Sequence, residues 1–157
     1  MPDSMPDYRG SKRTHVSLYA GRYKCQGGCM TMMINRLDTL AEVEIAFARY
    51  EAALEANDTA VLDELFWDSP HTIRYGAAEI LYGIEEIRAF RNARPAVGLE
   101  RVVSRTVITS YGRDCATAST LFHRTSMPGR VGRQMQTWVR LPEGWRVVAA
   151  HVSLIEE

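Results

Sequence analysis

Three shortages narrow the classes of protein to which this chain of 157 residues can belong. It has only 3 cysteines, too few for a disulfide-stapled fold, which favours a reducing compartment. It has no apolar run of about 18 residues, as a membrane-spanning helix requires, and no apolar leader of the signal-peptide type. Its formal net charge is +0, so global electrostatics favour neither nucleic acid nor an anionic membrane as partner. We therefore expect a cytoplasmic protein that binds neither.

Metal and phosphate motifs are equally scarce. Cys25 and Cys29 form a CQGGC pair with only His15 nearby, whereas a structural zinc ion takes four ligands. No HxH or HExxH spacing, serine-nucleophile elbow or glycine-rich phosphate loop occurs. The sequence therefore predicts no metal site and no cofactor.

The chain divides near residue 36. Residues 1–35 are rich in Pro, Gly, Ser, Arg and Met and lack a sustained apolar period, which predicts a disordered N-terminal extension. The alternative for this segment is a metal or redox role for Cys25 and Cys29. Residues 36–157 have the length and balanced composition of one domain.

The first half of that domain has helical patterns. Apolar residues recur at spacings of 3 and 4 from residue 40, which predicts one buried face of an amphipathic helix: Leu40, Val43, Phe47, Tyr50 and Leu54. Asp38 is its candidate N-cap, and Asp58 is positioned to cap a second, short helix over 59–66. A third helix is predicted over 84–93, stopped by Pro95.

The second half has strand patterns. Short extended pieces at 71–75 and 79–82 precede four longer strands at 99–111, 114–125, 133–141 and 145–154, whose turns contain Gly112, Pro128 and Gly144. This order predicts an α+β fold, in which a curved antiparallel sheet packs on three N-terminal helices as a cone. The open end of such a cone is a natural small-molecule pocket.

Both faces of the last two strands carry apolar residues. Strict alternation assigns Met135, Val139, Trp145, Val147 and His151 to one face. The other face then holds Trp138, Val148, Val152 and Leu154. Because a solvated sheet face alternates more cleanly with polar residues, one face is expected to line the cone and the other to form a homodimer.

Glu64–Pro95 concentrates the residues best suited to binding an anion. Its arginines are Arg74, Arg88, Arg91 and Arg94, of which Arg94 is the weakest pocket candidate, and they are interspersed with aromatic residues. Guanidinium binds carboxylate with two parallel hydrogen bonds, so a small anionic ligand is predicted. The alternative for Arg88, Arg91 and Arg94 is a solvated helix face paired with Glu85 or Glu86. The candidate ligand-binding residues are His71, Tyr75, Tyr82, Arg88, Arg91, Gln136 and Trp138.

The motifs ELFW, TIRYG, LYGIEEIRAFR, VITSYGRD and GRQMQTWVRLPEGWRVVAAHVS resemble the AtzH-like family, and within it the HpxZ type of oxalurate catabolism in purine degradation. The resemblance covers roughly 37–154. It implies the cone fold of SnoaL-like and nuclear transport factor two-like proteins, a small carboxylated urea as substrate, and an association with amidase-signature hydrolases.

The resemblance also implies that Tyr50 and Arg74 are the catalytic pair. Arg74 would hold a carboxylate, and Tyr50 would donate a proton to the nitrogen that carbon dioxide leaves. From its position on an apolar stripe alone, Tyr50 could equally be a core tyrosine. Two functions remain open: a cofactor-free decarboxylating amidohydrolase, or a non-catalytic binding or accessory protein for a partner amidase.

Overall fold

A computed structural model describes residues 22–23, 32–95 and 99–157. The helices are α1 (Leu37–Glu55), α2 (Thr59–Glu64) and α3 (Gly83–Ala93). The strands are β1 (Arg22–Tyr23), β2 (Met32–Met33), β3 (Ile73–Tyr75), β4 (Ile80–Tyr82), β5 (Val102–Tyr111), β6 (Cys115–His123), β7 (Arg130–Leu141) and β8 (Gly144–Glu156). The interpretation of Cys25, Cys29 and most of residues 1–35 lies outside the described residues.

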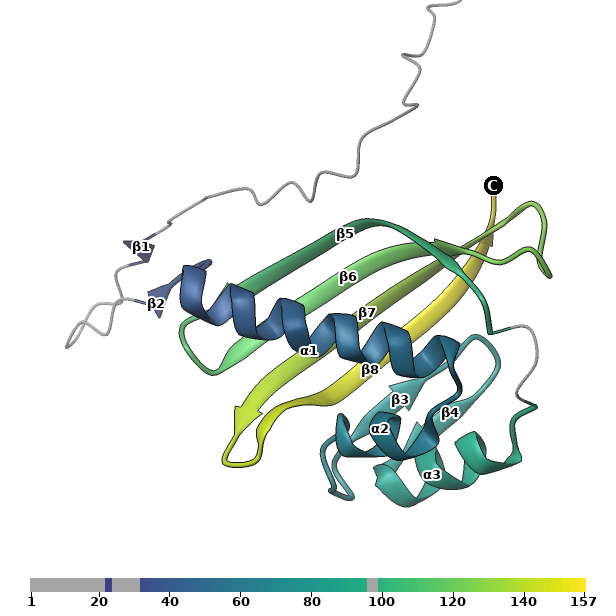
Figure 1. Ribbon diagram of the computed structural model, residues 1–157, viewed down its shortest axis with the longest axis horizontal. Helices are drawn as coiled ribbons and strands as arrows, with labels where there is room; N and C mark the ends of the chain where they lie inside the picture. The colour runs from purple at the N-terminus through teal and green to yellow at the C-terminus, as the bar shows by residue number, and fades with distance from the viewer. Residues whose placement is uncertain (1–21, 24–31, 96–98) are drawn as a thin grey trace, which may run out of the picture.

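A curved six-stranded sheet in the order β4-β3-β8-β7-β6-β5 carries the helices on its concave side (Figure 1). Strands β5 to β8 form the predicted antiparallel meander. The short hairpin of β3 and β4 extends it, because β3 pairs in parallel with β8. The predicted α+β cone is confirmed. None of the helices in the described part of the chain is long and apolar enough to cross a membrane.

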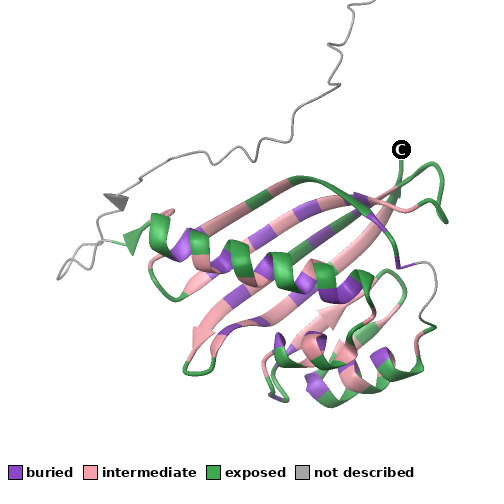
Figure 2. Cartoon of the chain, in the orientation of Figure 1, coloured by how far each residue is buried: buried purple, intermediate pink, exposed green. Residues whose placement is uncertain are grey.

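The apolar stripe predicted for α1 is buried along its whole length. Figure 2 shows the buried positions of α1 turned toward the sheet. The predicted cap of α2 is confirmed, because the Asp58 carboxylate accepts a hydrogen bond from the Val61 N–H at 3.0 Å. The predicted cap of α1 is wrong by two positions: Arg36 is the N-cap, and Asp38 lies in the first turn and pairs with Arg36 at 2.7 Å.

A bulge in β8 overturns the predicted division of the sheet into faces. Thr137 lies opposite Ala149 but Trp138 lies opposite Val147, so Val148 is an extra residue in its strand. The bulge shifts the parity of β8, and Trp145 and Val147 are therefore buried in the core with Trp138. They do not share a face with Met135, which is 52% exposed.

Candidate functional site

A cavity of about 190 Å³ lies at the open end of the cone, between α3, the β3–β4 turn and the inner face of the sheet. Its lining is Arg74, Ala77, Glu79, Phe90, Arg94, Leu99, Phe122, Arg124, Met127, Val152 and Leu154. Three arginines against one glutamate leave an excess of two positive charges in otherwise apolar walls. Such a concave, mostly apolar site with a few convergent polar groups suits a small anion.

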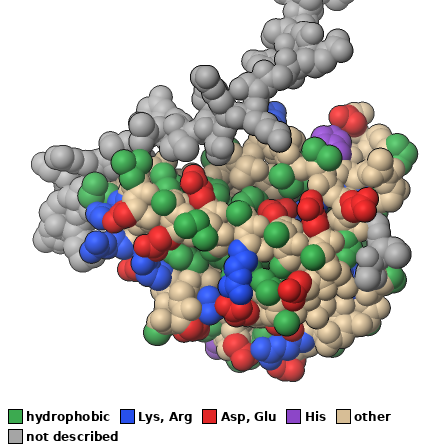
Figure 3. Space-filling view, in the orientation of Figure 1, with side chains coloured by type: hydrophobic (Ala, Val, Ile, Leu, Met, Phe, Trp, Pro, Cys, Tyr) green, Lys and Arg blue, Asp and Glu red, His purple; other side chains and the backbone are tan. Residues whose placement is uncertain are grey.

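The cationic excess belongs to the cavity and not to the visible surface. On the face drawn in Figure 3, basic and acidic side chains are interspersed and no large patch of one sign forms. This distribution fits the net charge of +0 and concentrates the attraction for an anion at one place.

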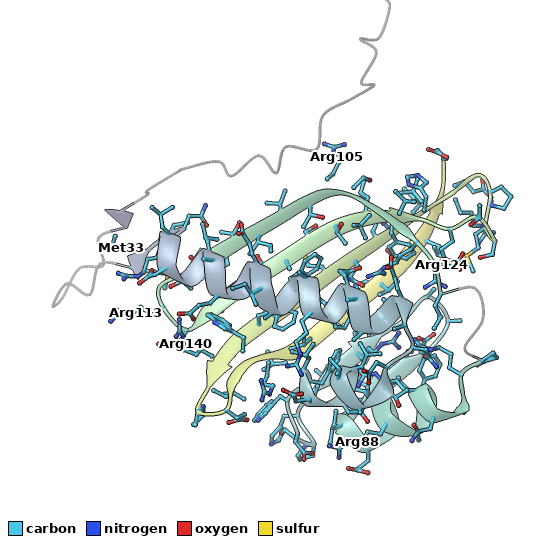
Figure 4. The ribbon with its side chains drawn as sticks, in the orientation of Figure 1. Met33, Arg88, Arg105, Arg113, Arg124 and Arg140 are labelled. Carbon is cyan, nitrogen blue, oxygen red and sulfur yellow. The ribbon has the colours of Figure 1, made fainter. Side chains whose placement is uncertain are left out.

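Arg94 and Arg124 each present a buried Nε–H that has no hydrogen-bond partner among the described residues. The other end of Arg94 is anchored, because its Nη2 donates to Asn57 Oδ1 at 2.7 Å. The guanidinium of Arg124 lies 5.5 Å from the centre of the Phe122 ring, where β6 ends (Figure 4). Burial lowers the pKa of both arginines, and the charge of Arg74 lowers that of Arg94 further. Two such donors in one cavity are well suited to an anionic ligand, since an unmatched buried donor costs about 1–3 kcal/mol.

Arg74 reaches the same cavity from β3. Its Nη1 donates to Glu79 Oε1 at 2.5 Å, and its guanidinium lies 5.0 Å from the centre of the Phe90 ring. Arg74 is thus partly engaged by a carboxylate of the protein itself. A ligand can share Arg74 with Glu79, whereas the Nε groups of Arg94 and Arg124 are buried without a partner among the described residues.

Tyr50 is 6% exposed on the inner side of α1. Its ring lies 6.3 Å from both Phe66 and Trp138, edge-on to the latter. Burial lowers the pKa of Arg94 and Arg124, and the phenol of Tyr50 opposes that shift electrostatically in both. Tyr50 is not among the residues that line the cavity, and it is linked to Arg94 and Arg124 only in the sense that its charged form would favour theirs.

Gln136 lies in one row of the sheet with Arg74, because β8 pairs Ala150 with both residues. Gln136 is 1% exposed, and its Oε1 accepts a hydrogen bond from Trp138 Nε1 at 3.2 Å. Since an indole N–H can only donate, this contact fixes the amide and leaves Nε2 as a buried donor without a protein partner in the described structure. Gln136 is not among the residues that line the cavity, and Ala150 between it and Arg74 belongs to the hydrophobic core.

The structure does not bring Tyr75 and Tyr82 to this cavity. Arg74 faces inward, so the next residue on the strand faces outward. The hydroxyls of Tyr75 and Tyr82 bond to each other at 2.8 Å, and Tyr75 also contacts the ring of His151, which is exposed. His71 is exposed as well and stacks on Trp67 at 6.3 Å. Tyr75, Tyr82 and His71 were predicted to line the pocket, but they lie outside it.

Arg88 and Arg91 were predicted to bind the ligand, but each pairs with an acidic residue of the protein. Arg88 points away from the sheet (Figure 4) and pairs with Glu85 at 2.6 Å, as the alternative interpretation had it. Arg91 is 3% exposed and covers the Phe66 ring while pairing with Asp63 at 2.5 Å. Its donors stabilise the junction of α2 and α3 beside the cavity, and it does not line the cavity.

The sequence interpretation missed Arg124 and Glu79. The buried positions Ala116, Ala118, Thr120 and Phe122 alternate along β6, and continuing that period of two leads directly to Arg124. Glu79 left no comparable signal, because its place depends on a turn geometry that the sequence does not reveal.

A second, closed arginine network lies beside the cavity. Arg101 binds Glu51 with Nε at 3.0 Å and Nη2 at 2.5 Å, and donates to Gln134 at 3.1 Å. Gln134 returns a hydrogen bond to Glu51 at 3.1 Å. These groups satisfy one another and join α1 to the sheet. In the described parts of the chain, His, Cys, Asp and Glu side chains form no group of three that could hold a metal ion.

Comparison with known proteins places this geometry in a family. Residues 32–157 match the AtzH-like family over their whole extent. The chain belongs to the AtzH-like family. No curated protein matches it significantly.

Solved structures agree with that membership. The chain is 64% identical to a protein of unknown function from Pectobacterium atrosepticum, with a TM-score of 0.77 over 78% of this chain and 95% of that one. It is 49% identical to a cystatin-like fold protein from Burkholderia xenovorans, with a TM-score of 0.77 over 80% and 98% of the two chains. An NTF2-like protein from Novosphingobium aromaticivorans, 21% identical with a TM-score of 0.58 over 76% and 83%, shows the fold alone.

Proposed function

We propose that this AtzH-like protein binds a small N-carboxylated urea or oxalurate-related amide in the cavity and decarboxylates the N-carboxylated form without a cofactor. This would be a role of the HpxZ type in nitrogen catabolism. The observation that carries the proposal is the pair of buried, unpartnered Nε–H donors of Arg94 and Arg124 in a cavity with two excess positive charges. A ligand with two carboxylates matches both features, since charge-assisted hydrogen bonds from guanidinium to carboxylate are strong and directional.

The chemistry requires one proton and no metal. In an N-carboxyurea, R–CO–NH–COO⁻, the bond between the nitrogen and the carboxylate carbon breaks and carbon dioxide leaves. The electron pair of that bond stays on the nitrogen, which takes the proton of the Tyr50 hydroxyl and gives R–CO–NH₂. Solvent then returns a proton to Tyr50. A positioned proton donor of this kind contributes about 10²–10⁴-fold to the rate.

The surroundings of Tyr50 support this role. The tyrosinate formed during the reaction would be favoured by the positive charges of Arg94 and Arg124, just as its negative charge would raise the pKa of both arginines. The apolar walls of Phe90, Leu99 and Val152 strengthen these interactions, because charges attract more strongly where water is excluded.

A non-catalytic binding or accessory role for a partner amidase is the second candidate. It is favoured by the isolation of the Tyr50 hydroxyl, for which the described residues supply no hydrogen-bond partner that could relay a proton. Binding alone requires only the cavity arginines, whereas turnover also requires Tyr50.

We also propose that the protein forms a homodimer through the outer face of the sheet. Val107, Ser119, Met135, His151 and Tyr75 form one row across its strands. Val107 is 55% exposed and Met135 is 52% exposed. Met135→Lys should convert a dimer to a monomer in sedimentation velocity, and a wild-type protein that already sediments as a monomer contradicts the proposal.

The function is tested by measuring carbon dioxide release from freshly generated 1,3-dicarboxyurea and, separately, thermal stabilisation of the protein by oxalurate. Wild-type protein should release carbon dioxide, and Tyr50→Phe should lower that rate by about 10²–10⁴-fold while leaving ligand binding in place. The matched control is Tyr111→Phe, a change at an exposed tyrosine on β5, whereas Tyr50 is buried on the inner side of α1. Thermal stabilisation without any release would instead support the binding role.

A further inference from the structure

Glu79 is the one carboxylate in the cavity lining, among three arginines. The Glu79 side chain is 21% exposed, so it is largely withdrawn from solvent. A cavity that attracts anions would bind them more strongly without a negative charge of its own. The negative charge of Glu79 must therefore have a function other than attracting the anion.

The turn between β3 and β4 holds this carboxylate in place. Oε1 accepts a hydrogen bond from Arg74 at 2.5 Å and Oε2 accepts one from the Ala78 N–H at 3.2 Å, while the Gly76 N–H closes the turn on the Glu79 carbonyl at 2.8 Å. A Cβ on residue 76 would lie 1.8 Å from Oε1 and 2.5 Å from Oε2. Glycine at position 76 thus creates the space that the Glu79 carboxylate fills.

An ionised carboxylate can only accept hydrogen bonds, and its two oxygens offer about four acceptor sites. Protein donors occupy two of these sites in Glu79. A ligand atom beside Glu79 must therefore be a donor or apolar, and a second carboxylate there would be repelled. Arg94 and Arg124, the other two cationic residues of the lining, would take the ligand's carboxylate.

We propose that Glu79 determines specificity by accepting a hydrogen bond from an N–H of the ligand. The site would then select amide- or urea-type anions over dicarboxylates of the same shape that have a methylene group in place of the N–H. This inference rests on the proposed anion site, but it does not require turnover.

A single pair of stable probes isolates this interaction. N-oxalylglycine and 2-oxoglutarate are both dianions, and they differ by one N–H in place of one methylene. Isothermal titration calorimetry on wild-type protein should show N-oxalylglycine binding about tenfold more tightly, or better, because a hydrogen bond to a charged group has at least that effect.

Two variants separate the charge of Glu79 from its position. Glu79→Gln removes the charge, and Gly76→Ala keeps the charge but displaces the carboxylate, whose flexible end can move aside. Both should reduce the preference for N-oxalylglycine to within about threefold, and Glu79→Gln should also bind 2-oxoglutarate more tightly than wild type does. Glu85→Gln, a change at an exposed carboxylate paired with Arg88, should keep the full preference.

The outcomes distinguish this inference from the proposed function. Equal affinity of wild-type protein for both probes overturns the role of Glu79 and leaves the anion site intact. A preference that survives in both variants likewise overturns it. Failure of both probes to bind contradicts the anion site itself, and the inference with it.

Discussion

Two arginines, one from the partnered network and one from the cavity, lie near the same aromatic ring. The guanidinium of Arg101 lies 4.8 Å from the centre of the Phe122 ring and that of Arg124 lies 5.5 Å from it. Arg101 is bound by Glu51 and Gln134, whereas Arg124 keeps a buried Nε–H without a partner in the described structure. The same residue type thus supports the fold where it is partnered and is free for a ligand where it is not.

The contrast has an energetic meaning. In the Glu51–Arg101–Gln134 network, removing one member leaves the remaining charge buried and unmatched. At the cavity, the unmatched charge is already present in the free protein, so the arginines there lower stability until an anion binds. Sites that bind charged ligands are commonly stabilised less than the fold around them for this reason.

The largest expected effect is the loss of the closed network. Arg101→Leu should lower the free energy of unfolding by about 3–5 kcal/mol, because Glu51 then keeps a largely buried charge without its partner. Urea denaturation measures this loss. The double variant Glu51→Met/Arg101→Leu should recover most of it. If the free energy of unfolding of Arg101→Leu stayed within about 1 kcal/mol of wild type, Arg101 would not be a structural arginine in contrast to those of the cavity.

Arg124→Met should separate binding from stability. Affinity for oxalurate should fall by about tenfold to a hundredfold, since hydrogen bonds to charged groups contribute about 1.5–3 kcal/mol. The free energy of unfolding should stay unchanged or rise, because an unmatched buried charge is removed. Arg113→Met, at the exposed hairpin between β5 and β6, is the control and should change neither quantity. A destabilised Arg124→Met protein would mean that Arg124 is a structural arginine.

Gly132→Ala should disturb the Phe122 ring, which both Arg101 and Arg124 approach. A Cβ at this position would lie 2.1 Å from the Phe122 ring, which must then move. Overpacking of this kind costs about 1–3 kcal/mol of stability, and the displaced ring should also weaken anion binding severalfold. Adding Phe122→Leu should relieve the clash and restore part of the stability. Unchanged stability in the single variant would show that the ring has room to move.

The smallest expected effect on stability comes from the exposed ion pair of Arg36 and Asp38. The hydrogen bond from Arg36 is the main cause that lowers the pKa of Asp38 from 3.8 to about 2, and the Thr39 N–H contributes next. A pKa that is lower in the folded state gives stability that is present above the unfolded value and lost as the pH falls through about 2. Asp38→Asn should therefore lower the urea midpoint slightly at pH 6, and the difference should shrink at pH 3. A midpoint difference that grows on acidification would contradict this account.

Periodicity was sufficient to predict the fold. The spacing of Leu40, Val43, Phe47, Tyr50 and Leu54 predicted the buried face of α1, and the Gly and Pro turns predicted the meander. The faces of β7 and β8 were predicted wrongly because Val148 is an extra residue. A bulge leaves the composition of a strand unchanged and alters only its parity.

The candidate site was predicted only in part, for the same kind of reason. Arg74 and Arg94 lie at the cavity, but Arg88 and Arg91 on the same helix pair with acidic residues. The partner of Arg88 is local and was among the predicted alternatives, whereas that of Arg91 is Asp63, 28 residues away in the chain. A local pattern of charges along one helix contains no information about such a distant contact.

The most direct test of the central claim is a crystal structure of the protein grown with oxalurate at a concentration that saturates its thermal stabilisation. We predict a ligand carboxylate within hydrogen-bond distance of the Nε atoms of Arg94 and Arg124, with the ligand N–H facing Glu79. Oxalurate bound outside this cavity, or Nε groups that bond to the protein while the ligand is bound, would contradict the account.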